Sequence, residues 1–302
     1  MSRRKFGAIT VGSGLAFMLP RLADADALYD IVRKVLANEP IPAAQKRLLA
    51  PGVTMGGARP KALLDLDGEQ WIVKFSADDP TDTPLIEHAS MTLARKAGIR
   101  TATTRPIRLV DGHAVAVERF DRRAGRRLHA LSANVALKAA GESLGYPELA
   151  QLLRRRGVVA GDVQTIQMGE LFRRMAFNIL IDNTDDHEKN HVLLVNDAQQ
   201  YELSPAFDVL PSGQALGYQQ MRVGTAGADA TLENALSMSA LFGLKTDAAV
   251  KELRAVIAAV ARWKAHFAAA GVGKHDIAAC AEQLDRPFLR DQRAAFAGRQ
   301  GR

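Results

Sequence analysis

The stretch Asn183-Thr184-Asp185-Asp186-His187-Glu188-Lys189-Asn190 places an amide five residues after a carboxylate, and a second carboxylate, Asp208, follows beyond a predicted hairpin. A carboxylate, an amide and a further carboxylate in this order are the side chains that kinase-type phosphoryl-transfer sites use. In such a site Asp185 would accept the proton of the attacking hydroxyl, and Asn190 and Asp208 would hold Mg²⁺ at the ATP phosphates. The alternative is that Asp, Asn and Thr gather here only because they form loops.

The elements predicted around this stretch would bring its polar side chains together. Apolar residues recur at three- and four-residue intervals over 168–181, so a helix is expected to lead into the loop. After the loop, 191–195 and 201–203 are typical of two short strands with a turn-prone sequence between them. Helix, loop, hairpin and carboxylate in this order would fold the two acidic residues and the amide toward one another.

A second half of such a site lies upstream. Residues 71–75 form a short apolar strand with one lysine, Lys74, an awkward place for a charge unless it meets phosphate or a carboxylate. Thr83 and Pro84 then predict the start of a helix that contains Glu87. In kinases a strand lysine and a helix glutamate pair to fix the ATP phosphates. The separate alternatives are an edge-strand lysine that discourages aggregation and a first-turn acid favoured by the helix dipole.

A glycine-rich turn over 51–61 precedes a strand predicted at 62–66. The adjacent Gly56 and Gly57 would let backbone N–H groups approach phosphate oxygens closely, and Lys61 adds a positive charge. The turn matches neither the Walker consensus nor the glycine pattern of dinucleotide folds or protein kinases. A plain connecting loop therefore explains it equally well.

A hairpin predicted over 107–117 ends in a polar and aromatic segment that contains Glu118 and Phe120. A segment that leaves a small sheet in this way is where a two-lobed nucleotide-binding enzyme would connect its lobes and contact adenine. The equal alternative is that Phe120 is simply a core residue.

Together these residues resemble the HipA family of serine/threonine kinases, the toxin components of bacterial toxin–antitoxin pairs. The resemblance covers residues 48–209 and implies an α+β, bilobal protein-kinase-like fold, with a small β-rich N-lobe over 1–122 and a larger helical C-lobe over 123–302. The motifs that carry it are Thr54-Met-Gly-Gly-Ala-Arg-Pro-Lys61, Ile72-Val-Lys74, Ala116-Val-Glu-Arg-Phe-Asp-Arg122, Thr184-Asp-Asp-His-Glu-Lys-Asn190 and Ser204-Pro-Ala-Phe-Asp208.

The resemblance also implies roles for single residues. Lys74 would bind the ATP phosphates, Glu118 and Phe120 would line the adenine pocket, and Asp185 would be the catalytic acid/base residue. Asn190 and Asp208 would bind Mg²⁺. The other residues counted with the nucleotide site are Glu87, Gly56, Gly57, Lys61, His187 and Lys189.

Three departures from the family pattern affect regulation and assembly. Family members can autophosphorylate a serine in the glycine-rich loop, and the matching residue here is Thr54. They usually begin with a further small β-rich subdomain, which a separate short protein would supply unless the sequence is truncated. Asp186 stands where glycine is often found, so its charge would either bind metal or face solvent.

The expected function is therefore that of an ATP-dependent serine/threonine protein kinase, which transfers the γ-phosphoryl of MgATP to a protein hydroxyl. The resemblance suggests an aminoacyl-tRNA synthetase as the substrate and a HipB-like helix-turn-helix antitoxin as a partner. Two rival classes are a small-molecule kinase of the same fold and a catalytically silent antitoxin-binding remnant.

Composition is that of a cytosolic enzyme with a substantial core. Of the 302 residues 47% are hydrophobic, no apolar run is long enough to span a bilayer, and one cysteine, Cys280, excludes an intramolecular disulfide. The net charge of +7 points to polyanionic surroundings. Its densest patch is Arg122, Arg123, Arg126 and Arg127. Without a DNA-binding motif this patch is equally a solvated basic surface, and DNA contact is expected only through a partner.

The two ends of the chain allow further predictions. Arg3 and Arg4, followed by an apolar stretch, imitate a twin-arginine export signal, but an ATP-dependent enzyme outside the cytoplasm would be idle. The favoured interpretation is a strand at 8–11 and a helix at 24–37. Toward the other end, Thr246 and Asp247 are expected to cap one long helix that reaches Phe267. His266 and His275 are expected to be ordinary surface histidines.

Overall fold

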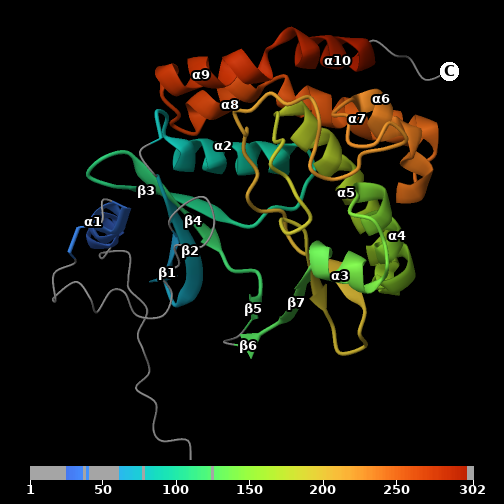
Figure 1. Cartoon of the computed structure of the whole chain (residues 1–302), viewed down its shortest axis with the longest axis horizontal. Coiled ribbons are helices and arrows are strands. Elements are labelled where there is room, and N and C mark those ends of the chain that lie inside the picture. The colour runs from blue at the N-terminus through green and yellow to red at the C-terminus, as the bar shows by residue number, and fades with distance from the viewer. Residues whose placement is uncertain (1–24, 37–38, 41–60, 77–78, 124–125, 298–302) are drawn as a thin grey trace, which may run out of the picture.

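The computed structural model describes residues 25–36, 39–40, 61–76, 79–123 and 126–297 (Figure 1). The predictions for Thr54, Gly56 and Gly57, the export-like segment and the strand at 8–11 therefore lie outside the described residues. Within these ranges, no helix has both the length and the apolar character that crossing a bilayer requires.

A four-stranded antiparallel sheet forms one end of the molecule (Figure 1). Its strands run in the order β1-β2-β4-β3, so β2 is a central strand. The interpretation of Lys74 as an edge-strand lysine is therefore wrong, because this residue lies on β2 between two paired neighbours. The strands are β1 (Lys61–Leu66), β2 (Glu69–Phe75), β3 (Thr104–Arg108) and β4 (His113–Glu118).

Helix α1 (Ala25–Leu36) covers one face of this sheet. Along β2 the buried residues Trp71, Val73 and Phe75 alternate with less buried ones, which is the period-two pattern of a strand with two unlike faces. The buried set joins Leu28 and Ile31 of α1 in a separate hydrophobic cluster. The helix predicted at 24–37 is present, and its role is to close the outer side of the sheet.

The opposite face of the sheet carries Lys74 and packs toward α2 (Thr83–Lys96). Val115 and Val117 of β4 belong to the main hydrophobic cluster together with the apolar side of α2. The helix begins where the sequence predicted, but its cap is Asp82, whose carboxylate accepts a hydrogen bond from the Leu85 backbone N–H at 3.3 Å. A short acceptor side chain at this position satisfies one of the free N–H groups of the first turn.

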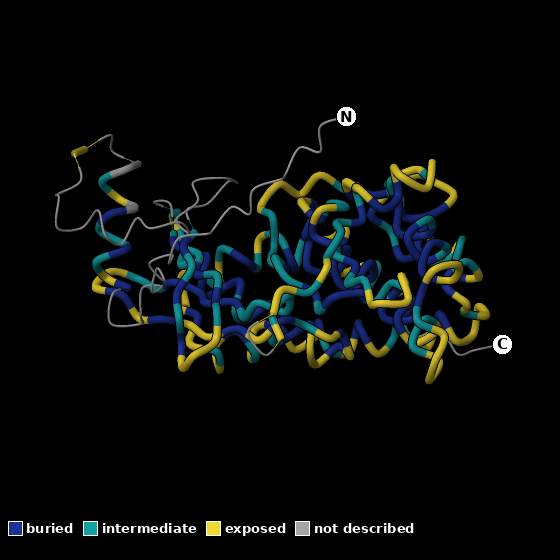
Figure 2. The backbone as a smooth tube through the Cα atoms, turned by 90° about the horizontal axis from the view of Figure 1, so that it is seen from below, coloured by how far each residue is buried: buried dark blue, intermediate teal, exposed yellow. Residues whose placement is uncertain are grey.

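Helix α5 (Val163–Leu180) is the centre of the larger, mainly helical part, and most of its residues are buried. Figure 2 shows long buried stretches of the backbone in this part, with many exposed stretches along its outer edge. It packs against α4 and α7, and its last residue leads directly into the predicted catalytic loop. The other helices of this part are α3 (Ala133–Ala139), α4 (Tyr146–Arg156), α6 (Leu232–Ser237), α7 (Thr246–Val260), α8 (Trp263–Ala269), α9 (Lys274–Leu284) and α10 (Pro287–Ala297).

Two predictions for the C-terminal helices are wrong. The long helix expected from Thr246 is divided into α7 and α8, with the break at 261–262, and its N-cap residue Lys245 makes no side-chain cap. His266 is not an ordinary surface histidine, because its Nε2 lies 2.9 Å from the Thr92 hydroxyl of α2. This contact joins α8 to α2, which also pack together. His275 is 80% exposed at its side chain and fits its prediction.

Two further sheets are smaller than the first one, with two and three strands. The predicted hairpin is present as β8 (Val192–Val195) and β9 (Tyr201–Leu203), and an unpredicted strand, β7 (His129–Ser132), pairs with β8. The arginine patch is a two-stranded ribbon of β5 (Arg122–Arg123) and β6 (Arg126–Arg127). The lobe boundary at residue 122 stays a prediction, since the main hydrophobic cluster includes α2 as well as the later helices.

We expect α1 to be an essential part of the folded protein. Leu28→Ala should lower the free energy of unfolding by about 2–5 kcal/mol, because Leu28 is 1% exposed and its removal leaves a cavity against the sheet. Leu216→Ala, the same change at a 38% exposed residue, should cost much less. Urea unfolding of both variants measures the difference. Equal losses would contradict the packing of α1 on the sheet.

Candidate active site

Lys74 lies between two carboxylates that come from distant parts of the chain. Its Nζ is 2.6 Å from Glu87 Oε1 on α2 and 2.7 Å from Asp208 Oδ1, which follows β9. The sheet, the helix and the segment after the second hairpin therefore meet at one ammonium group. The sequence predicted this pairing of a strand lysine, Lys74, with a helix glutamate, Glu87. The structure adds a contact of Lys74 with Asp208.

The two carboxylates differ in exposure, and this difference suggests different tasks. The side chain of Glu87 is 1% exposed, whereas that of Asp208 is 44% exposed. Burial opposes the charge of Lys74, but the two carboxylates outweigh it and raise the pKa of Lys74 above its usual value. Glu87 therefore holds the lysine from inside, and Asp208 presents part of its carboxylate to the solvent side.

A cleft of about 240 Å³ opens beside Lys74. Glu118 and Phe120, predicted to contact adenine, both line it, and the Phe120 ring packs on Phe207 with centroids 5.5 Å apart. Phe120 is partly buried and also packs against the main hydrophobic cluster, so it contacts both the core and the cleft, and its contact with adenine stays a prediction. The cleft lining consists of Ile72, Lys74, Val117, Glu118, Arg119, Phe120, Asp121, Ala130, Val192 and Phe207.

Lys61 lies close to this lining. In the antiparallel register it is directly opposite Lys74, so the two side chains extend from the same face of the sheet. Asp121 is another residue of the cleft lining, and Arg119 and Arg122 bind its carboxylate at 2.7 and 2.6 Å. Burial works against the charged form of Asp121, but these arginines lower its pKa below the usual value.

The loop after α5 is fastened to the segment that follows Asp208. Ser212 Oγ donates to the Asp182 carbonyl at 2.9 Å and lies 2.6 Å from the Thr184 hydroxyl. Arg286, just before α10, donates to Asp182 Oδ1 at 2.6 Å. These contacts fix the first turn of the loop before it reaches Asp185.

The two adjacent acids of the loop point in opposite directions. Asp185 is exposed, as a residue that meets a substrate must be, whereas the Asp186 side chain is 3% exposed. The expectation that Asp186 faces solvent is wrong, because its Oδ2 accepts hydrogen bonds from the Tyr146 hydroxyl and, at 2.8 Å, from His191 Nε2. Burial raises the pKa of Asp186, yet His191 and these bonds reverse the shift and lower it. Burial and the Asp186 charge raise the pKa of Tyr146 well above its usual value.

The rest of the loop is ordered by local contacts. Asn190 is 8% exposed, and its backbone N–H donates to the His187 carbonyl at 2.8 Å. The Glu188 side chain accepts a hydrogen bond from Asn134 at the start of α3. His187 is partly buried and Lys189 is exposed, and neither is among the residues that line the cleft. Their assignment to the nucleotide site stays a prediction.

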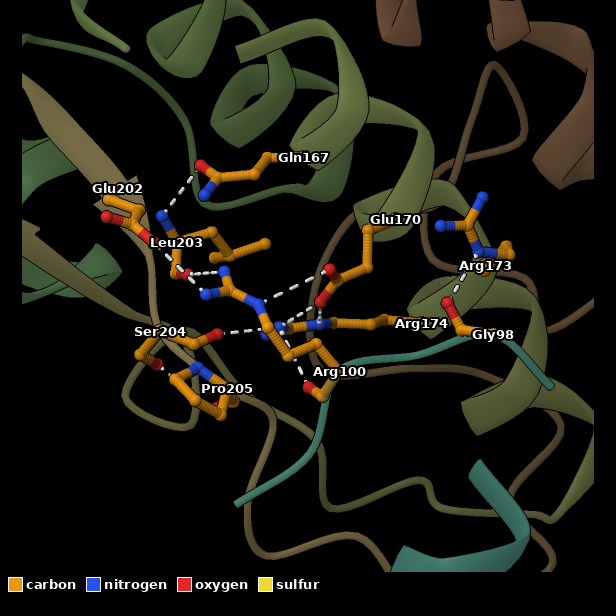
Figure 3. Close-up of polar contacts among 10 residues, drawn as sticks. All are labelled: Gly98, Arg100, Gln167, Glu170, Arg173, Arg174, Glu202, Leu203, Ser204 and Pro205. Carbon is orange, nitrogen blue, oxygen red and sulfur yellow. Dashed lines mark hydrogen bonds and ion pairs between the residues drawn. The ribbon is translucent and has the colours of Figure 1, made fainter. Parts of the chain in front are cut away.

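Helix α5 also holds the segment that leads to Asp208 (Figure 3). The buried side chain of Arg174 pairs with Glu170 one turn earlier, and its Nη2 donates to the Ser204 carbonyl at 2.6 Å. Gln167 accepts from the Leu203 backbone N–H at 2.8 Å. Burial lowers the pKa of the Arg174 guanidinium although Glu170 opposes this. The figure shows these side chains reaching from the helix to the strand end that precedes Asp208.

Oxygen donors are available for a divalent cation. No group of three or more His, Cys, Asp or Glu side chains suited to a metal occurs within the described residues. The predicted ligands are instead one amide, Asn190, and one carboxylate, Asp208. This donor set fits Mg²⁺, which proteins usually bind through one or two side chains while water and phosphate oxygens complete its shell.

Sequence reasoning missed several residues that support the site. Tyr146 carries no local signal, because its partner lies forty positions later in the chain. Glu170 and Arg174 did leave a signal, since a charge pair spaced by four residues on the apolar side of a helix indicates a buried role. Ser212 and Arg286 act through contacts that depend only on the tertiary fold.

A small antiparallel sheet, a helix that supplies a glutamate to a strand lysine, and a larger helical part with the loop define the kinase-like α+β fold. Two solved structures share it. One is HipA in the complex of the Shewanella oneidensis MR-1 toxin–antitoxin system with HipB and operator DNA, with a TM-score of 0.64, 17% identity and coverage of 96% of this chain and 73% of that chain. The other is the proinflammatory kinase CtkA of Helicobacter pylori, with a TM-score of 0.59, 12% identity and coverage of 82% and 94%.

The family is shown by the sequence itself. The model of the HipA-like C-terminal domain matches residues 53–264, and the chain belongs to this family. A Sinorhizobium fredii (strain NBRC 101917 / NGR234) protein named Putative kinase Y4dM is 30% identical over 160 residues, which are 47% of this chain. The match spans 37% of the length of that relative.

We expect Glu87 to stabilise the folded protein through Lys74. Glu87→Gln keeps the shape of the side chain but removes its charge, so one hydrogen-bonded ion pair of the buried ammonium is lost. The free energy of unfolding should fall by about 1.5–3 kcal/mol, because Asp208 still compensates the lysine. Glu69→Gln, on the exposed start of the same strand, is the matched control and should change stability by less than about 0.5 kcal/mol. Urea unfolding that gave the same value for both would refute the role of Glu87.

Proposed function

We propose that this chain is an ATP-dependent serine/threonine protein kinase, which transfers the γ-phosphoryl of MgATP to a protein hydroxyl. The observation that carries the proposal is the contact of Lys74 with both Glu87 and Asp208 beside a cleft lined by Phe120. A lysine held by a buried glutamate next to an aromatic cleft suits a nucleotide whose base lies against the aromatic ring and whose phosphates reach the ammonium.

In this mechanism the chain supplies position and charge. Lys74, oriented by Glu87, would bind phosphate oxygens, and Glu118 and Phe120 would contact the base. Asn190 and the exposed part of Asp208 would hold Mg²⁺, which neutralises charge on the phosphates when it is bound. Asp185, exposed at the tip of the loop, would orient the acceptor hydroxyl and take its proton.

Partners and regulation follow from the family and remain part of the proposal. The HipA neighbour forms a complex with HipB and DNA, which supports a HipB-like antitoxin as a partner of this chain. An aminoacyl-tRNA synthetase is the substrate to test first, and Thr54 is the candidate for autophosphorylation. A separate small protein that supplies an N-terminal subdomain, and a lobe boundary near residue 122, belong to the same proposal.

Asp185 should be needed for transfer but not for nucleotide binding. Asp185→Ala should lower kcat by about 10²–10⁴-fold, because proton transfer from the acceptor hydroxyl loses its base. Asp197→Ala, at an exposed residue of the β8–β9 turn, is the matched control and should leave kcat unchanged. The measurement is incorporation of label from γ-labelled ATP with Mg²⁺ and cell lysate.

The same assay separates the rival classes. Labelled protein supports a protein kinase, and label confined to small molecules supports a small-molecule kinase. No turnover by the parent protein supports a silent binding module. Normal activity of Asp185→Ala would overturn the assignment of the loop.

Asp208 should control the metal dependence of nucleotide binding. Asp208→Asn keeps the size of the side chain but removes the charge that attracts Mg²⁺, so ATP should bind about equally with Mg²⁺ and with EDTA. In the parent protein Mg²⁺ should strengthen binding. Calorimetric titration of ATP under both conditions measures this, and a variant that keeps the full effect of Mg²⁺ would show that the ligand is another residue.

A further inference from the structure

A buried polar network lies directly beneath the catalytic loop. Its centre is Asp186 Oδ2, which accepts from the Tyr146 hydroxyl of α4 and from His191 Nε2 at the end of the loop. The side chains of Asp186 and His191 are each 3% exposed, and Tyr146 is fully buried. Buried polar groups that are all hydrogen-bonded can hold one backbone arrangement against its alternatives.

The network continues into the end of α5. Asn178 Nδ2 donates to the Tyr146 hydroxyl at 3.4 Å, and Asn183 Nδ2 donates to Asn178 Oδ1 at 3.1 Å. The rings of Tyr146 and His191 pack edge to face, with centroids 5.4 Å apart. Two helices and both ends of the loop are therefore tied to one buried carboxylate.

The anchored residues are the immediate neighbours of the predicted functional ones. Asp186 follows Asp185, and His191 follows Asn190. Fixing Asp186 and His191 inside the protein therefore fixes the backbone from which Asp185 and Asn190 extend. A loop of polar residues without such anchors would lose conformational entropy each time it took up its working geometry.

A small cavity of about 10 Å³ adjoins the network. Its lining includes Asp186, Asn190, His191 and the two residues that flank Asp208, Phe207 and Val209. Arg174, whose Nη2 holds the segment before Asp208, also lines it. The cavity is thus adjacent to both predicted metal ligands, because Asn190 and the two neighbours of Asp208 line it.

Two buried nitrogen atoms of this lining have no partner in the part of the chain that the structure describes, Arg174 Nη1 and His191 Nδ1. His191 Nε2 is engaged by the Asp186 carboxylate, so Nδ1 is the ring nitrogen that lacks a partner within the described residues. A water molecule can both donate and accept, so one water could accept from Arg174 Nη1 and hydrogen-bond to His191 Nδ1, and the cavity volume of about 10 Å³ is close to what one water needs.

We propose that Asp186, with Tyr146 and His191, is a positioning residue that orients Asp185 and Asn190, and that one water bridges Arg174 and His191 behind them. This inference rests on the proposed kinase function. The bridge links the loop with Asp185 and Asn190 to the segment with Asp208, so that the three side chains keep one relative arrangement.

The experiment compares kcat and the KM for ATP in variants of the full chain. Asp186→Leu and Tyr146→Phe should lower kcat by about 10–100-fold and about 10-fold, respectively, as changes behind a metal site do. The KM for ATP should change less than kcat, because Lys74 and the cleft are unchanged. Asp186→Asn, which keeps an acceptor for both donors, should lose less than Asp186→Leu.

Two comparisons keep the test decisive. Tyr201→Phe is the matched control, since the Tyr201 hydroxyl makes no hydrogen bond within the described residues, and it should leave kcat unchanged. Tyr146→Phe is the mildest change and keeps the test valid if Asp186→Leu does not fold. A network with a purely structural role would lower the unfolding midpoint of Tyr146→Phe and leave its kcat at the parent value, which would overturn the proposal.

The outcomes also separate this inference from the proposed function. A parent protein that neither transfers phosphate nor binds MgATP would refute the proposed function. An active parent whose Asp186 and Tyr146 variants keep full kcat would refute the positioning role alone. A crystal structure that resolves ordered water should show one molecule within hydrogen-bonding distance of Arg174 Nη1 and His191 Nδ1, and an empty cavity would refute the bridge.

Discussion

The burial of one positive charge is the constraint around which this protein is built. Lys74 stands on a central strand, and taking an ammonium group out of water costs several kcal/mol. One carboxylate near a protein surface returns on the order of 4 kcal/mol, so a single partner would do little more than offset that cost. Glu87 and Asp208 act together on the ammonium, and they raise the pKa of Lys74 although burial opposes its charge. The sheet, α2 and the Asp208 segment must therefore come together for the lysine to be stable.

Helix α5 provides the platform for the other half of the site. One turn of it, with Glu170 and Arg174, holds the strand end before Asp208, and its last turn, with Asn178, supports the loop. A helix that is buried on nearly all sides moves little, so two segments fastened to it keep a constant separation. The polar residues on its buried side would weaken an ordinary core. Here Gln167 and Arg174 bind the backbone of Leu203 and Ser204, and Asn178 binds Asn183 at the start of the loop.

Local sequence patterns predicted the helices and strands of the site well, because each pattern depends only on residues that are close together in the sequence. The apolar run around Lys74, the proline of α2 and the hairpin before Asp208 each span only a few neighbouring residues. Prediction failed where a contact between distant residues decided the outcome. Nothing near Asp186 indicates that Tyr146, forty residues earlier, is its partner inside the protein, and nothing near His266 indicates its contact with Thr92. The break between α7 and α8 was missed for a related reason, since the apolar periodicity continues through residues 261–262.

The adjacent acids Asp185 and Asp186 show how one sequence motif can serve two physical purposes. Two carboxylates in a row would repel each other if both faced the same water-filled cleft, and neither would be held in one direction. In this fold Asp185 is exposed, and the buried carboxylate of Asp186 accepts hydrogen bonds from two donors. The hydrogen bonds of Asp186 fix the backbone at this point of the loop. The Asp185 carboxylate can therefore keep its direction although its side chain makes no hydrogen bond within the described residues. In the proposed site, Asp185 can stay exposed to a substrate and still extend from a fixed backbone, because its neighbour is buried and hydrogen-bonded.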